Sequence, residues 1–274
     1  MRIMSVAILL MTLAAAVAAV AQGAPPQTSM VMSTALPTSA AAPASPYDPQ
    51  LLALMKQAST PYAGPAWSIF NHRASGVFVL LWGLTALIVG LQYPRRTWFR
   101  FVPPFALFGL VEFLILRNDP MAWPLGPIGF WYSMRSPEVF QHRLFILMIL
   151  ALGIIELLRA ADRLPAALAR YALPAVALVA SVLILFHQHA GPAMEQAMQM
   201  QMHGMAMGRG DPNKAMEVTM AHIKHEHMWF AIFGFCLVIS KLLADTGRLP
   251  GRLGATLWPL FAVVTGAYLL GYTE

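Results

Sequence analysis

The sequence is poor in charged residues and has almost no cysteine. Asp, Glu, Lys and Arg make up 11% of its 274 residues, whereas about 25% is usual in soluble proteins. This shortage argues against an ordinary water-soluble enzyme. Cys236 is the single cysteine, which excludes a disulfide scaffold. Apolar residues account for 58% of the chain, too many for a largely disordered protein.

The net charge of +6 does not indicate a nucleic-acid partner. The basic residues lie in short clusters between long apolar runs, which is the pattern of loops between membrane-spanning segments. The lipid bilayer is therefore the expected surroundings of the chain.

The N-terminus has the pattern of a secretory signal. Arg2 precedes the apolar run 6–20, which ends in Ala19-Val20-Ala21. We predict a signal peptide over residues 1–21; an uncleaved anchor helix is the alternative. Residues 22–65 are rich in Ala, Pro, Ser and Thr, and we expect a flexible periplasmic tether there.

Residues 66–274 contain six further apolar segments, each near the length that crosses a bilayer as a helix. Continuous apolar runs favour helices, because a β-barrel would alternate in short strands. The fold class is therefore predicted as all-α, a polytopic membrane helix bundle with six transmembrane helices. The predicted spans are 71–93, 98–116, 141–159, 167–187, 225–244 and 254–272.

The predicted orientation has both termini in the periplasm, with the bundle in a bacterial inner membrane. A signal peptide places the mature N-terminus outside, and six spans return the C-terminus to that side. Basic residues concentrate in the three short inside connections, as the positive-inside rule requires. These residues are Arg95, Arg96, Arg100, Arg159, Arg163, Arg170, Lys241, Arg248 and Arg252.

A short repeat opens the first, third and fifth spans. They begin with Phe70-Asn71-His72-Arg73, with Phe140-Gln141-His142-Arg143 and with Glu226-His227-Met228-Trp229-Phe230. We interpret the three spans as the starts of three related helix hairpins. By this topology all eight histidines of the chain lie at the outer face or in its loops. Considered alone, His72 and His142 could equally be ordinary polar residues at a hydrated helix end.

The loop 187–228 is rich in methionine and histidine. Its centre reads Met198-Gln199-Met200-Gln201-Met202-His203-Gly204-Met205-Ala206-Met207. Thioethers favour Cu(I), and imidazoles bind copper in both oxidation states. Copper is the predicted ion, with Cu⁺ favoured; a Met-rich amphipathic helix on lipid or a partner is the alternative. The predicted ligands are His72, His142, His187, His189, Met200, Met202, His203, Met205, Met207, His222, His225 and His227.

Glu112 lies inside the second span, where a carboxyl group is costly. By the predicted topology Arg73 and Arg143 share its depth. Glu112 is therefore expected either to form a salt bridge with one of these arginines or to line an ion path.

The chain resembles the bacterial copper-resistance D family of inner-membrane proteins. The resemblance is carried by the three motifs that open the odd-numbered spans, by Arg117-Asn118-Asp119-Pro120-Met121-Ala122-Trp123-Pro124, and by the Met/His-rich outer loop. It covers about residues 66–272 and implies copper handling between periplasm and cytoplasm. The chain departs from the family in having six spans, where members commonly have eight, and in its long tether.

The favoured hypothesis is a copper-handling membrane protein that is not an enzyme and serves copper transport, resistance or delivery. A periplasmic copper chaperone or a cuproenzyme is the expected partner. No Walker sequence is present, which disfavours direct pumping by ATP. A b-type haem electron carrier is the first alternative, with paired histidines as haem ligands. A structural or assembly subunit is the second.

Overall fold

The fold is described from a computed structural model. It describes residues 65–91, 97–119, 121–187 and 212–273, all within one compact unit, 60–274. The predicted signal peptide, the tether up to residue 64 and the loop centre 188–211 lie outside the described residues.

The described residues form helices and no β-strand, as predicted. Ala122 and Ile128 form an isolated bridge within a turn. The helices are α3 (Pro65–Gly90), the 3₁₀ helix η1 (Thr97–Phe101), α4 (Val102–Arg117), α5 (Phe130–Ser133), α6 (Pro137–Ala160), α7 (Ala166–Ile184), α9 (Pro212–Asp245) and α10 (Gly251–Leu270).

Five helices are long and apolar enough to cross a membrane. They cover Ala66–Gly90, Trp98–Arg117, Ala166–Ile184, Ala221–Asp245 and Gly251–Leu270. The helix at the predicted span 141–159 is α6, which is not among the five and carries Glu138, Arg143, Glu156 and Arg159. The chain is thus a multi-pass membrane bundle, and a sixth crossing by α6 stays a prediction.

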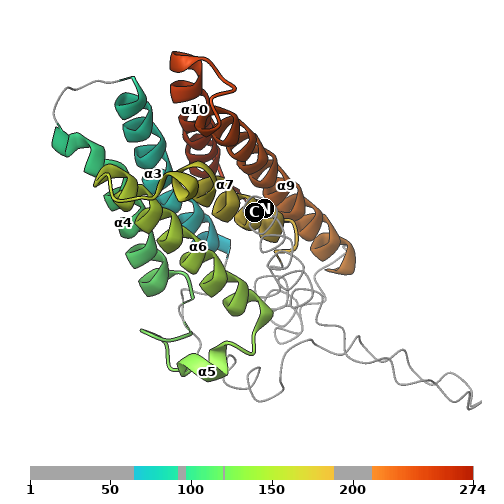
Figure 1. Cartoon of the computed structure of the whole chain (residues 1–274). Coiled ribbons are helices and arrows are strands. Elements are labelled where there is room, and N and C mark those ends of the chain that lie inside the picture. The colour runs from blue at the N-terminus through green and yellow to red at the C-terminus, as the bar shows by residue number, and fades with distance from the viewer. Residues whose placement is uncertain (1–64, 92–96, 120, 188–211, 274) are drawn as a thin grey trace, which may run out of the picture. The chain divides into compact units, whose positions relative to one another are not determined.

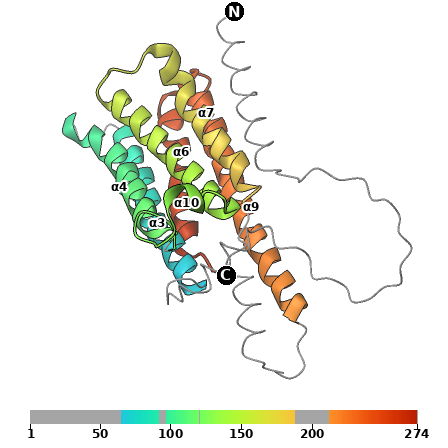
Figure 2. The same ribbon diagram turned by 90° about the horizontal axis from the view of Figure 1, so that it is seen from below.

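The start of α9 corrects the predicted boundary at residue 225. The helix begins at Pro212 and runs for 34 residues, so the last part of the predicted loop 187–228 is helical. Proline suits the first turn of a helix because its missing N–H would have no partner there. Residues 212–220 therefore extend beyond the apolar segment, as the ribbon of α9 shows (Figures 1 and 2).

Six helices pack in a ring that follows chain order. Each of α3, α4, α6, α7, α9 and α10 contacts the next, and α10 returns to α3. The buried core draws on all six. Large apolar side chains such as Phe105 and Ile239 are instead exposed on the outside, where lipid would cover them.

The α3–α10 contact depends on small residues. Gly76, Gly83 and Gly90 recur every seven positions on one face of α3. A Cβ atom on Gly83 would lie 2.6 Å from the backbone nitrogen of Val263. At Gly90 it would lie 2.4 Å from the carbonyl oxygen of Ala255. Pro259 cannot donate to that carbonyl within α10, so the oxygen faces α3 instead. The two helices thus meet backbone to backbone.

Replacing Gly83 with alanine should therefore loosen the bundle. The added methyl meets backbone atoms that cannot rotate away, and overpacking of this kind costs about 1–3 kcal/mol. We expect G83A to lower the melting temperature of the protein in mild detergent. Gly251→Ala is the matched control, because a Cβ there meets no atom within 4 Å. Equal melting temperatures for the two variants would contradict the close helix contact.

Candidate metal centre at the histidine end

Four histidines, three in the helices α3, α6 and α9 and one just after α7, meet at one end of the bundle, which we call the histidine end. His72 lies near the start of α3, His142 near the start of α6, and His227 within α9. His187 follows the last residue of α7, Ile184, so α7 ends where the other three helices enter.

The four imidazoles form a row. The ring centroids of His142 and His187 are 5.0 Å apart, and those of His187 and His227 are 5.1 Å apart. His72 follows at 6.1 Å from His227. We call these four side chains the histidine row. Segments far apart in the sequence thus place their imidazoles side by side, as the common orientation of the odd-numbered spans predicts.

Two members of the row bond to their own helices. Nδ1 of His72 lies 2.9 Å from the carbonyl oxygen of Ser68, and Nδ1 of His227 lies 2.7 Å from that of Ile223. Each partner stands four residues earlier in the same helix. A carbonyl oxygen only accepts, so in both rings Nδ1 carries the hydrogen and donates it.

The other two members bond to polar side chains. Nδ1 of His142 lies 2.7 Å from Oδ1 of Asp119, in the turn after α4. Nδ1 of His187 lies 2.9 Å from Oε1 of Gln141. The amide nitrogen of Gln141 donates to the carbonyl of Phe186 at 3.0 Å, which orients Oε1 toward His187.

All four rings therefore carry a hydrogen on Nδ1, which each ring donates to an oxygen. A metal-binding histidine is usually held in this way, with one nitrogen donating to an oxygen while the other faces the ion. The carboxylate of Asp119 also leaves Oδ2 buried, where it accepts no hydrogen bond from any described residue.

Tyr272 closes the row beside α3. Its ring stacks on that of His72 with centroids 4.0 Å apart, and its side chain is fully buried. Nε of Arg73 donates to its carbonyl oxygen at 3.1 Å, which holds the C-terminal segment against α3.

The row suits pairwise binding of an ion. A first-row metal lies about 2 Å from a coordinating nitrogen, so two imidazoles that share it have centroids roughly 4–6 Å apart. The spacing of the row falls close to this range. Within the described ranges, however, no three or more His, Cys, Asp or Glu side chains are arranged around one point as a metal site.

The two remaining described histidines lie apart from the row. His225 is exposed, and its Nε2 accepts a hydrogen bond from Nε1 of Trp229 at 3.2 Å. Two residues span about 200° around a helix, which places His225 nearly opposite the buried His227. Nε2 of His222 lies 3.3 Å from Oγ1 of Thr273. The other predicted ligands fall outside the described residues: His189, Met200, Met202, His203, Met205 and Met207.

Neither expected arginine pairs with Glu112. Glu112 is exposed on α4, and among the described residues it forms no ion pair. Arg73 bonds to Tyr272, whereas the buried Arg143 donates to the carbonyl of Trp123. The expected salt bridge is therefore wrong. The reason is rotational: α4 turns Glu112 outward, while Arg143 points inward.

Comparison with protein-family models, with curated proteins and with solved structures finds no match. The case for any activity consequently rests on the side chains of this chain.

The tautomer of His187 should depend on Gln141. Gln141→Met keeps a long side chain but removes the acceptor of Nδ1, so the ring should populate both tautomers. Side-chain ¹⁵N NMR of the purified protein would show this change for His187. The ring of His227 serves as the internal control, because its acceptor is a backbone carbonyl. A His187 signal unchanged by the substitution would contradict the assigned bond.

Proposed function

We propose that this chain handles copper in a bacterial inner membrane, binding the ion at its periplasmic face for transport, resistance or delivery. The observation that supports the proposal is the histidine row, in which four imidazoles from separate segments share one end of the bundle and each donates from Nδ1 to an oxygen. Copper is the cargo, and the chain acts as a carrier, without a catalytic step.

The row supplies nitrogen donors that need little rearrangement. Each Nδ1 is already bonded to oxygen, which fixes the ring and increases the basicity of Nε2. Neighbouring rings are close enough for two Nε2 atoms to share one ion. Because neutral imidazole and copper are well matched, the row favours copper over hard cations such as Mg²⁺ or Ca²⁺.

The loop centre supplies sulfur donors in the sequence. Met200, Met202, Met205 and Met207 alternate with small or polar residues around His203. Thioethers bind Cu⁺ without losing a proton, and they do not form disulfides in an oxidising compartment. We propose that the loop takes up Cu⁺ and passes it to the row. The resemblance to the copper-resistance D family agrees with a copper-handling role for the loop and the row.

A periplasmic copper chaperone or a cuproenzyme is the proposed partner. The loop and the row lie at the same end of the bundle by the predicted topology, so both would face it. We also propose that both termini lie in the periplasm.

Loss of His227 should weaken copper binding strongly. His227 is buried and its ring neighbours both His187 and His72, so H227A removes a donor from two pairs. We expect the copper affinity of the purified protein to fall by about 100-fold or more, because loss of a ligand should cost at least as much as loss of a bond that supports one. Competition with a chromophoric Cu⁺ chelator measures the affinity.

His225→Ala is the matched control, because His225 lies on the same helix and points away from the row. Its copper affinity should equal that of the wild type. Equal losses in both variants, or no loss in H227A, would overturn the assignment of the row. An absorption spectrum of the same samples tests the haem alternative, since a Soret band that H227A abolishes would favour haem.

Replacing the loop methionines should slow the capture of Cu⁺ and leave the histidine row able to bind it. With Met200, Met202, Met205 and Met207 replaced by leucine, we expect slower uptake of Cu⁺ from a weak chelator and reduced copper tolerance of cells. The amount of copper held after prolonged loading should stay unchanged, because the row remains. If uptake and tolerance both matched the wild type, the loop would instead serve assembly with a partner.

A further inference from the structure

A second group of ionisable side chains lies far from the histidine row, on two of the same helices. Glu156 stands fourteen positions after His142 on α6, and Lys241 stands fourteen positions after His227 on α9. At about 1.5 Å per residue this separation is about 21 Å along each helix. With Arg159 and Asp245, Glu156 and Lys241 form what we call the charged cluster.

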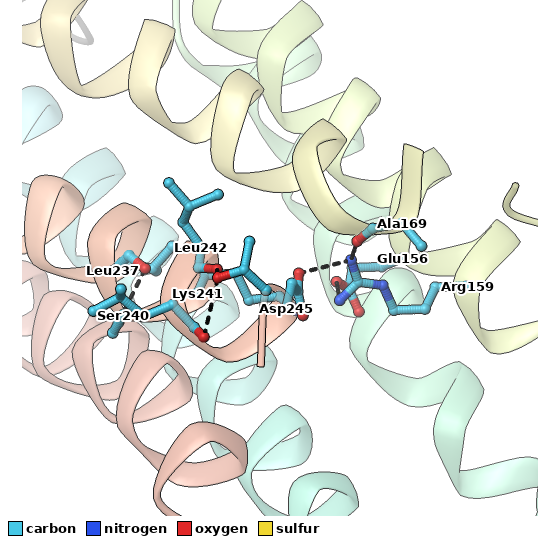
Figure 3. Close-up of polar contacts among 10 residues, drawn as sticks. Glu156, Arg159, Ala169, Leu237, Ser240, Lys241, Leu242 and Asp245 are labelled. Atoms are coloured by element: carbon cyan, nitrogen blue, oxygen red, sulfur yellow. Dashed lines mark hydrogen bonds and ion pairs between the residues drawn. The ribbon is translucent and has the colours of Figure 1, made fainter. Parts of the chain in front are cut away.

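Asp245 is the most strongly bonded member of the charged cluster. Nζ of Lys241 lies 2.6 and 2.7 Å from its two carboxylate oxygens, and the guanidinium of Arg159 lies 3.3 Å from one of them. Arg159 also donates to the carbonyl of Ala169 on α7 at 2.5 Å. Figure 3 shows this junction of α6, α7 and α9. Asp245 is thus stabilised as an anion by two cations.

Lys241 is fixed by contacts with Asp245 and Trp258. Its side chain is 3% exposed, and Nζ lies 4.8 Å from the ring centroid of Trp258 on α10. The aromatic face and the carboxylate of Asp245 favour the charged ammonium, whereas burial and the guanidinium of Arg159 disfavour it.

Glu156 is bonded differently from Asp245. The residue is 8% exposed, and its Oε1 lies 4.0 Å from the guanidinium of Arg159, beyond hydrogen-bond distance. No described residue donates a hydrogen bond to this buried oxygen. A buried carboxylate oxygen without a donor adds to the desolvation penalty of the ionised group, and addition of a proton removes that charge.

Among the described residues, no charged group outside the cluster acts on Glu156. The charged residues of α4, Glu112 and Arg117, are both exposed. α7 offers the carbonyl of Ala169, and its Arg170 is exposed. On α10 the cluster meets Trp258, whereas Arg252 is exposed. Arg100 of η1 pairs with Asp162 at 2.6 Å on the surface. The charge state of Glu156 therefore depends on Arg159, Lys241 and Asp245.

We propose that Glu156 is a proton-binding site inside the bundle, which takes up one proton from water at Oε1 and releases it reversibly. With Glu156 ionised the cluster has two anions and two cations. With the proton bound it has a net charge of +1, and Arg159 keeps Asp245 and Ala169 as its partners. An ionisable residue within a membrane bundle commonly serves ion movement. The site is independent of copper.

Infrared difference spectroscopy of the metal-free full chain in detergent tests this site. Lowering the pH should produce the C=O stretching band of a protonated carboxyl in a dry environment, equivalent to one group per chain. Glu156→Gln should abolish that band. Asp162→Asn is the control, because Asp162 is an exposed acid, and this variant should retain the band in full.

A folded E156Q that keeps the band, or a wild type that never shows it, would overturn the proposal. Should E156Q fail to fold, Glu156→Asp decides instead. A band that moves in frequency in E156D supports the site, and one that stays in place refutes it. Copper binding by H227A and by the wild type is measured separately, so either proposal can fail alone.

Discussion

Polar groups in a membrane bundle must find partners within the protein, because hydrocarbon offers none. The need for partners within the protein explains how the side chains of the histidine row are held. His72 and His227 use carbonyls of their own helices, and His142 and His187 use Asp119 and Gln141. Each bond satisfies one ring nitrogen and holds the imidazole beside its neighbour in the row. A set of polar residues that would be costly one by one thereby becomes an ordered group of donors.

The same requirement separates the two ends of the bundle. α6 and α9 each carry a histidine at one end and a buried charge at the other, with apolar turns between them. The ring of helices keeps both groups away from lipid, and at Gly76, Gly83 and Gly90 the helix α3 closely approaches the backbone of α10. Helix packing is therefore tight where the chain has glycine, and the polar chemistry concentrates where α6, α7 and α9 meet.

The sequence predicted the fold class and which histidines share an end. Those expectations depend on apolar length and on the alternating direction of the spans, and both can be read along the chain. It could not predict which way each side chain turns. His225 and His227 look alike in sequence, yet they lie on opposite faces of α9. Glu112 turns outward, and the roles of Asp119, Gln141 and Tyr272 follow from contacts across helices. A signal for Gln141 was present, because it immediately precedes His142 in a motif that repeats.

The linear form of the row bears on what copper would do there. His187 belongs to two neighbouring pairs, and so does His227. An ion moving from one pair to the next would keep one imidazole throughout, so no step would require a bare ion. A closed site with four converging ligands would bind more tightly and release more slowly. Under the proposed function, the open row would suit passage of an ion better than storage, and the thioethers of the loop would deliver copper to it.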